Sequence, residues 1–158
     1  MAETAIQSNQ PYEYINKEKW FSFTLPASWT FQENAFGSLV MFFAPQEKWD
    51  TIKENIGVTA TELTGNVQLS SYFELAKGIA ESVISNYKIE KEEPITINGE
   101  NAMKVIYKGV QGGENLQREQ VIVLKWKTAY VITYTATEKT FNNLLVGVDN
   151  IINTFTIN

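Results

Sequence analysis

The sequence predicts an α+β fold in which one antiparallel sheet lies between two helices. Two segments, 69–87 and 141–155, repeat apolar residues with the 3.6-residue period of an amphipathic helix. The other apolar segments alternate with a period of two, which is typical of strands with one buried face. The links between these strands are short, which favours antiparallel pairing. We therefore expect an α/β/α sandwich with one helix on each face of the sheet, formed by a single domain at 12–158 after a flexible segment at 1–11.

The first predicted strands are rich in aromatic residues. Segment 21–25 reads FSFTL, and Pro26 ends this strand because proline has no N–H to donate to a neighbouring strand. A similar alternation resumes at Trp29. Segment 39–43 is apolar on both faces, which predicts a strand inside the sheet, and segment 56–63 predicts another.

Two helix starts are predicted from side chains that cap the first turn. Ser71 followed three residues later by Glu74 forms a capping-box pattern, so we expect the first helix to begin there. Thr137 is the expected N-cap of the last helix, whose apolar residues recur at three- and four-residue spacing as far as Phe155.

The stretch between the helices predicts a series of hairpins. Segment 87–97 reads as extended chain, and Asn98-Gly99 is a residue pair typical of a tight type I′ turn. Segment 102–110 is therefore expected to pair with it. A second hairpin is predicted from 118–127 and 129–136, which are separated by little more than one residue.

Composition excludes several classes of function. The chain of 158 residues has no Cys and no His, which excludes thiol catalysis, His-based triads and zinc sites built on these residues. A net charge of −5 disfavours a general nucleic-acid binder, which needs a basic surface. No apolar run is long enough to span a membrane, and the first residues lack the pattern of a signal peptide. We expect no cofactor.

Exposed aromatic residues on polar loops are the best candidates for a binding surface. The loop at 46–55 contains one tryptophan, and the turn at 111–115 is polar. The candidate binding residues on these loops and at the neighbouring start of the domain are Trp49, Asp50, Glu114, Tyr12 and Tyr14. The other tryptophans, Trp20, Trp29 and Trp126, fall within strand patterns and are expected in or beside the core.

Acidic residues suggest two weaker candidate sites. Glu90, Glu92 and Glu93 cluster with Lys88 and Lys91 and could hold a hard cation, but charged side chains that protect a strand edge are the favoured interpretation. Acid–base catalysis would need two carboxylates facing one another in a cleft. The residues considered for this role are Glu47, Asp50, Glu54, Glu62 and Glu74.

Part of this pattern resembles a known family. The chain has F-S-F-x-x-P-x-x-W at Phe21–Trp29 and N-T-F at Asn153–Phe155, with the intervening order of strands and helix. Over residues 12–157 it resembles the PsbP-like superfamily, which includes extrinsic photosystem II proteins, bacterial lipoproteins of the DcrB-like type and a yeast Ran-binding import factor. The resemblance implies an α/β/α sandwich and a noncatalytic binding or assembly role. Metal sites of photosynthetic members use His, so no metal ligand is implied here.

These considerations predict a noncatalytic accessory protein that binds an unidentified protein partner and no nucleic acid. The resemblance implies an exported bacterial lipoprotein, extracytoplasmic and attached through an anchoring Cys that lies outside this chain; a cytoplasmic location is the alternative. A second possible function is a small-ligand or lipid-binding module with a pocket between the sheet and a helix. A third is an enzyme that uses carboxylates alone.

Overall fold

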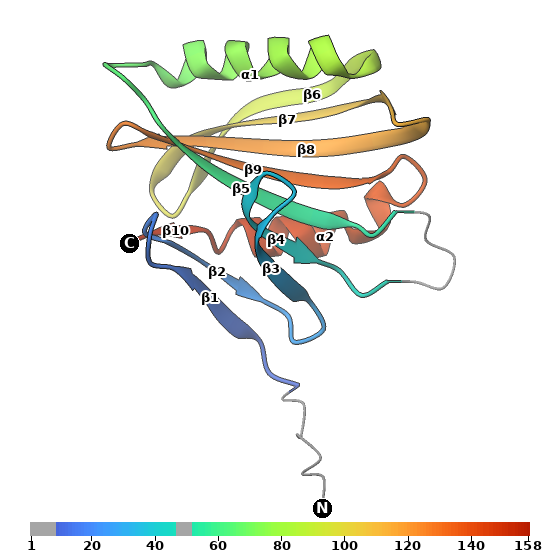
Figure 1. Cartoon of the computed structure of the whole chain (residues 1–158), viewed down its shortest axis with the longest axis horizontal. Helices are drawn as coiled ribbons and strands as arrows, with labels where there is room; N and C mark the ends of the chain where they lie inside the picture. Colours follow the sequence, from blue (N-terminus) through green and yellow to red (C-terminus); the bar gives the residue numbers. More distant parts are fainter. Residues whose placement is uncertain (1–8, 47–51) are drawn as a thin grey trace, which may run out of the picture.

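The computed structural model describes residues 9–46 and 52–158, whose strands form two antiparallel sheets. The small sheet has the order β1 (Tyr12–Asn16), β2 (Phe21–Leu25) and β10 (Thr156–Ile157). The large sheet has the order β3 (Thr30–Ala35), β4 (Ser38–Phe43), β5 (Asn55–Glu62), β9 (Thr128–Thr137), β8 (Glu114–Lys125), β7 (Glu100–Gln111) and β6 (Ser85–Ile97). Figure 1 shows both sheets with the helices α1 (Leu69–Val83) and α2 (Phe141–Ile152).

Long hairpins build most of the large sheet, as the sequence predicts. The turn at Asn98-Gly99 has left-handed φ values of 46° and 81°, and Ile97 pairs with Glu100 on either side of it, so the predicted type I′ hairpin is confirmed. Strand β4 lies between β3 and β5, in agreement with its two apolar faces. After β5 the chain passes through α1 to β6 at the edge of the sheet and returns through β7 and β8, so that β9 pairs with β5.

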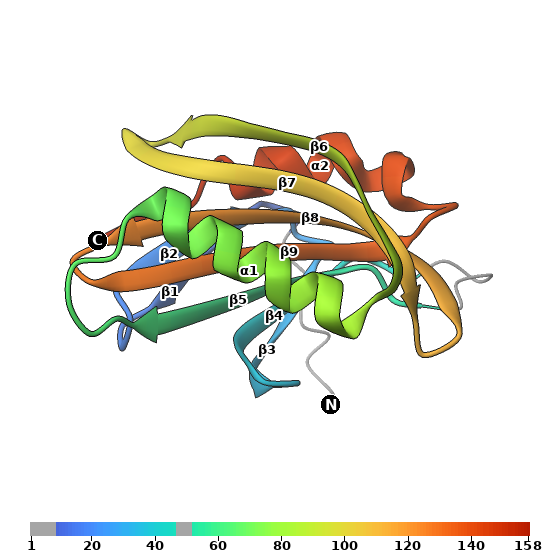
Figure 2. The same ribbon diagram turned by 90° about the horizontal axis from the view of Figure 1, so that it is seen from above.

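Helix α1 covers one face of the large sheet. Its buried residues Phe73 and Ala80 pack against Val105, Tyr107 and Ile122 of β7 and β8. Figure 2 shows the helix lying across this face. Because a helix of this length gains most of its stability from such packing, these contacts fix its position.

The side of α1 that faces away from the sheet carries three exposed apolar residues. Leu75, Ile79 and Val83 recur every four residues and are 58%, 57% and 59% exposed. They form a stripe along the helix, because a spacing of four returns to the same face.

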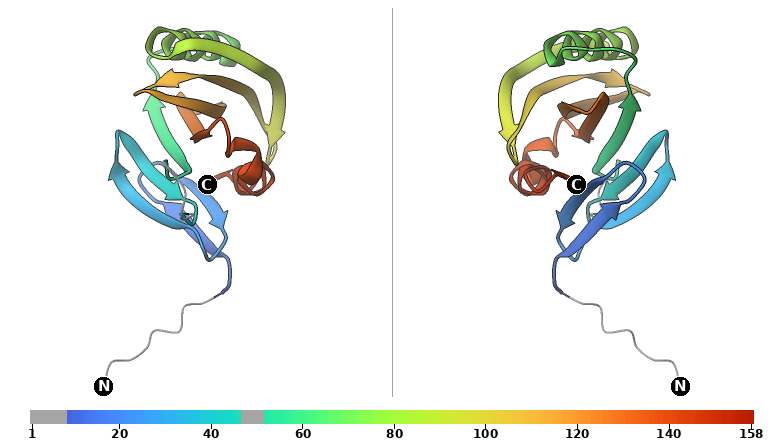
Figure 3. Two further views of the ribbon diagram at one scale, coloured as in Figure 1. Left: turned by 90° about the vertical axis from the view of Figure 1, so that its right-hand side faces the viewer. Right: turned by 90° about the vertical axis from the view of Figure 1, so that its left-hand side faces the viewer.

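The main core lies inside the angle between the two sheets. Val121 and Val123 of β8 belong to this core together with Val148 of α2 and the aromatic residues Phe21 and Phe23 of β2. The end-on views of Figure 3 show α2 and the small sheet next to one another. The expected single sheet is therefore wrong, because the aromatic FSFTL strand belongs to a second sheet that helps α2 to close the core.

Both predicted helix caps are wrong. Helix α1 begins at Leu69, two residues before Ser71, and no side chain caps its first turn. Helix α2 begins at Phe141, whereas Thr137 is the last residue of β9. The Thr137 hydroxyl accepts a hydrogen bond of 3.3 Å from the backbone N–H of Thr140 and so shapes the turn ahead of the helix.

Candidate functional site

The predicted binding residues do not gather into one surface. Trp49 and Asp50 lie outside the described residues. Glu114 is exposed at the turn between β7 and β8. Tyr14 is only 4% exposed and contributes to the main core. Tyr12 is half-buried beside that core.

Both tyrosine hydroxyls make hydrogen bonds within the chain. The Tyr12 hydroxyl donates to the backbone oxygen of Trp29 at 2.9 Å, and the Tyr14 hydroxyl donates to Glu33 Oε1 at 2.8 Å. Burial and the bond with Glu33 raise the pKa of Tyr14 to about 12, so it stays neutral. These two residues hold β1 against β3 and Trp29.

Two tryptophans that were expected near the core lie on the surface. Trp29 is buried, as predicted, but Trp20 is 62% exposed and Trp126 is 69% exposed. Both exposed residues have left-handed backbone conformations, with φ values of 59° and 51°. Trp20 lies in the turn directly before β2, and Trp126 directly follows the last residue of β8, so neither belongs to the alternation of a strand.

The turn that carries Trp126 is strained. Lys125 pairs with Thr128, so the turn consists of Trp126 and Lys127, with φ values of 51° and 61°. This is the type I′ arrangement that the chain elsewhere builds from Asn98-Gly99. A left-handed conformation costs a residue with a side chain about 1–2 kcal/mol, and large residues are rare there. An exposed tryptophan in such a position is an outlier from which a functional hypothesis can start.

Hydrogen bonds tie the turns of this end of the molecule together. The Tyr130 hydroxyl donates to the backbone oxygen of Lys19 at 2.8 Å, next to Trp20. The Leu63 N–H donates to the oxygen of Lys127 at 2.7 Å, next to Trp126. Figure 1 shows the β1–β2 turn, the β8–β9 turn and the loop after β5 at the same end.

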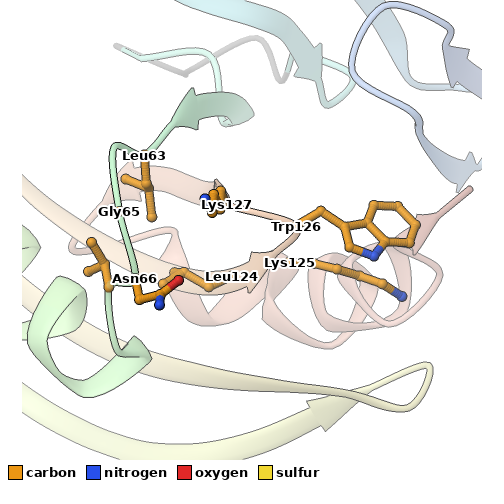
Figure 4. Close-up of a pocket in the computed structure, with 8 residues that line it drawn as sticks. Leu63, Gly65, Asn66, Leu124, Lys125, Trp126 and Lys127 are labelled. Atoms are coloured by element: carbon orange, nitrogen blue, oxygen red, sulfur yellow. The ribbon is translucent and has the colours of Figure 1, made fainter.

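We call this region the tryptophan end and define it by Trp20, Trp126 and a pocket beside Trp126. The pocket has a volume of about 220 Å³ and is shown in Figure 4. Its lining combines apolar side chains, one amide and two cations: Leu63, Gly65, Asn66, Val67, Leu124, Lys125, Trp126 and Lys127. This volume accommodates one large side chain or a small ligand.

Cations border the exposed indoles. Lys125 Nζ lies 4.6 Å from the centre of a Trp126 ring, within the range of a cation–π contact, and it also pairs with Glu100. Figure 4 shows Lys125 and Trp126 extending to the same side of the turn. Lys19, next to Trp20, forms an ion pair of 3.3 Å with Glu62. The lysines next to both indoles are therefore themselves paired with carboxylates, and Lys125 also contacts the Trp126 ring.

The carboxylates considered for acid–base chemistry do not meet in the described part of the chain. Glu54 is buried just ahead of β5, and Glu62 is exposed at the other end of that strand. Glu74 lies on α1 and pairs with Lys77 at 2.8 Å. Glu47 and Asp50 lie outside the described residues. Residues 9–46 and 52–158 contain no group of three or more acidic side chains placed to hold a metal ion.

The acidic residues of β6 are paired along a sheet edge. Strand β6 ends the large sheet, and Glu92 pairs with Lys77 at 2.8 Å. Glu90 pairs with Lys108 at 3.1 Å, and Glu93 with Lys91 at 3.2 Å. This arrangement agrees with the interpretation of charges that protect an exposed strand edge.

Comparison with protein families identifies the class that this fold defines. Residues 2–157 match the family described as PsbP-like protein, so the chain belongs to that family. The resemblance seen in the sequence is therefore confirmed. No curated protein matches the chain. In the described residues, neither helix is long and apolar enough to cross a membrane.

Solved structures share the fold at low sequence identity. The cyanobacterial PsbP (CyanoP) of Synechocystis sp. PCC 6803 has a TM-score of 0.72 and 13% identity, with 100% of this chain and 98% of that chain covered. LpqN of Mycobacterium tuberculosis is described as involved in cell envelope biogenesis. Its structure has a TM-score of 0.65 and 13% sequence identity, with 96% of this chain and 86% of LpqN covered. The Ran-binding protein Mog1p of Saccharomyces cerevisiae has a TM-score of 0.64 and 9% sequence identity, with 95% of this chain and 96% of Mog1p covered. These similarities show the α+β fold.

Neither exposed tryptophan nor the tryptophan end was found by sequence reasoning. Trp126-Lys127 lacks the Gly, Asn or Asp that marks a type I′ turn, so the strand pattern of the sequence continues through Trp126. The one available signal was the chain direction, because the segments on either side of Trp126 are apolar and antiparallel and must reverse near it.

Proposed function

We propose that this chain is a noncatalytic accessory protein that binds a partner protein through the tryptophan end. The observation that carries the proposal is the pair of exposed indoles on turns that hydrogen bonds hold together. Tryptophan contributes strongly to the energetic centre of protein interfaces, because a rigid ring buries a large area with little loss of conformational freedom. The pocket beside Trp126 could receive one apolar side chain of the partner.

The relatives support a binding role and the proposed location. One neighbour is described as Ran-binding and another as involved in cell envelope biogenesis. By analogy we propose that this chain acts in complex with another protein, and that it is the exported domain of a bacterial lipoprotein on the outer face of a membrane. The fold alone does not decide function, so the argument depends on the surface.

The loop at 46–55 with Trp49 and Asp50, together with Glu114, remains a competing proposal for the binding surface. Glu114 and Lys125 are the two ends of β8. A strand of this length spans about 36 Å at the usual rise per residue. A partner centred on Trp126 therefore makes its main contacts far from Glu114, and mutations can separate the two surfaces.

A small-ligand or lipid-binding module is the second candidate function. It is favoured by the pocket beside Trp126, which lies between the loop ahead of α1 and the β8–β9 turn. Its volume of about 220 Å³ is below the roughly 300–1,000 Å³ typical of small-molecule sites. A ligand panel tests this function, because a compound that binds the native state raises the melting temperature.

Affinity capture with matched variants tests the proposed function. The chain is used as bait in extract from its source, and each retained protein is compared between the wild type and variants. We expect one protein to be lost with Trp20→Ala combined with Trp126→Ala, and to be kept with Ile79→Ala. Ile79 is a suitable control because it is an exposed apolar residue on a different surface. Retention by the double variant, or loss with Ile79→Ala, would contradict the proposal.

A further inference from the structure

One acidic residue is completely buried where the large sheet faces the main core. Glu119 is 0% exposed and lies on β8 in the same alternation as Val121 and Val123, which belong to that core. Its neighbours across the sheet are Ile106 on β7 and Tyr134 on β9. An isolated charge in such surroundings is strongly disfavoured, so the groups that meet this carboxyl determine its state.

Lys104 is the cation that pairs with Glu119 in the described part of the chain, and it is shared between carboxylates. Lys104 Nζ lies 3.2 Å from Glu119 Oε1 and 3.5 Å from Glu93 Oε1. Glu93 is also paired with Lys91 at 3.2 Å. Within the described residues, neither oxygen of Glu119 accepts a well-oriented hydrogen bond from an N–H or hydroxyl group. Lys104 therefore leaves the carboxyl incompletely satisfied.

Tyr134 does not supply the missing donor. Tyr134 is buried beside Glu119, but its hydroxyl donates to the backbone oxygen of Phe141 at 2.9 Å. Burial, and to a smaller extent the charge of Glu54, raise the pKa of Tyr134, so the tyrosine stays neutral. From α2, Asp149 comes within hydrogen-bonding reach of Glu119. Two carboxyl groups can be joined by a hydrogen bond only if one of them carries a proton.

We propose that Glu119 and Asp149 form a proton-binding pair that fastens α2 to the large sheet. With the proton bound, Glu119 donates to the Asp149 carboxylate and its buried oxygens are satisfied. Without it, two carboxylates share the site with one lysine and repel each other. The pH dependence follows this geometry: burial first, and then Asp149, raise the pKa of Glu119 to about 8, while Lys104 lowers it.

The pair is connected to the tryptophan end through the chain that follows α2. Asn98 Nδ2 donates to the oxygen of Phe155 at 2.7 Å, and the next residues form β10 against β2. The Asn158 N–H then donates to the oxygen of Trp20 at 2.7 Å. The segment after α2 therefore contacts the turn that carries Trp20.

Urea unfolding of the full chain at pH 5, 7 and 9 tests the pair. We expect the wild-type midpoint to fall between pH 5 and pH 9, and the fall to be smaller in Glu119→Gln. The Gln amide donates to Asp149 at every pH, so this variant keeps the bond without a proton. Glu114→Gln is the matched control on the same strand, and it should show the wild-type fall. Equal pH dependence in Glu119→Gln and the wild type would overturn the proposal.

A direct titration keeps the test decisive if Glu119→Gln does not fold. The side-chain carboxyl signals of wild-type protein labelled with ¹³C in glutamate are followed by NMR from pH 3 to pH 10. We expect one glutamate to titrate above pH 7. Titration of every glutamate below pH 6 would overturn the proposal.

Discussion

Replacing Trp126-Lys127 with Asn-Gly should make the protein more stable and less able to bind. The residues Asn and Gly already form the β6–β7 turn in the same left-handed conformation. Relief of strain is worth about 1–2 kcal/mol at each position. The flexibility of Gly in the unfolded chain lowers stability by about 0.5–1 kcal/mol. Loss of the cation–π contact between Lys125 and Trp126 lowers it by a similar amount. We expect a net gain of about 1 kcal/mol, which corresponds to a rise of about 2–4 °C in melting temperature.

Thermal unfolding and partner capture are measured on the same preparations. Lys127→Gly alone is the control, because it relieves strain but keeps Trp126, and it should be stabilised while binding remains. The reasoning is refuted if the Asn-Gly variant retains the partner, since the indole would then be dispensable. It is also refuted if the Asn-Gly variant melts below the wild type, since the turn would not be strained.

Three further predictions concern the fold. Because the pKa of Glu119 is raised in the native state, that state binds more protons than the unfolded state between about pH 4.5 and pH 8. Glu119 should therefore lower the free energy of unfolding as pH rises through this window, by at most about 1.4 kcal/mol per pH unit, as urea titrations can show. Gly109→Ala should lower the free energy of unfolding by about 1–3 kcal/mol, because a Cβ there would lie 2.3 Å from a methyl carbon and 2.7 Å from a backbone oxygen. Gly147→Ala should raise the free energy of unfolding by about 1 kcal/mol, because a Cβ at this exposed helix position meets nothing within 4 Å. Asn98→Ala removes the hydrogen bonds to the segment after α2 and should lower stability by about 1–3 kcal/mol in the same assay.

Local patterns in the sequence predicted most of the large sheet. Strand alternation and the Asn98-Gly99 pair are properties of neighbouring residues, so they can be read without knowing the tertiary structure. The buried acid could also have been found in this way. Glu119 stands in the same alternation as Val121 and Val123, and this places it on the inner face of β8. Clusters of charge along the sequence do not reveal it, because Asp149, its proposed partner, lies thirty residues later.

Features that depend on distant contacts could not be predicted. Residues 156–157 pair with β2 from the far end of the chain and form the third strand of the small sheet. The start of α1 is decided by packing on the sheet, which outweighs the capping pattern at Ser71. Trp126 is exposed because hairpin register forces the turn onto it, although its residue type is typical of a strand.

Site-specific photo-crosslinking tests the central claim most directly. A photoreactive amino acid is placed at Lys127, beside an intact Trp126, and in separate proteins at Ile79 of α1 and at Glu114. The partner identified by capture is then mixed with each protein and irradiated. We expect a crosslinked complex from position 127 that disappears when Trp126→Ala is added. A complex formed from position 79 or 114 and not from position 127 would contradict the claim that the tryptophan end binds the partner.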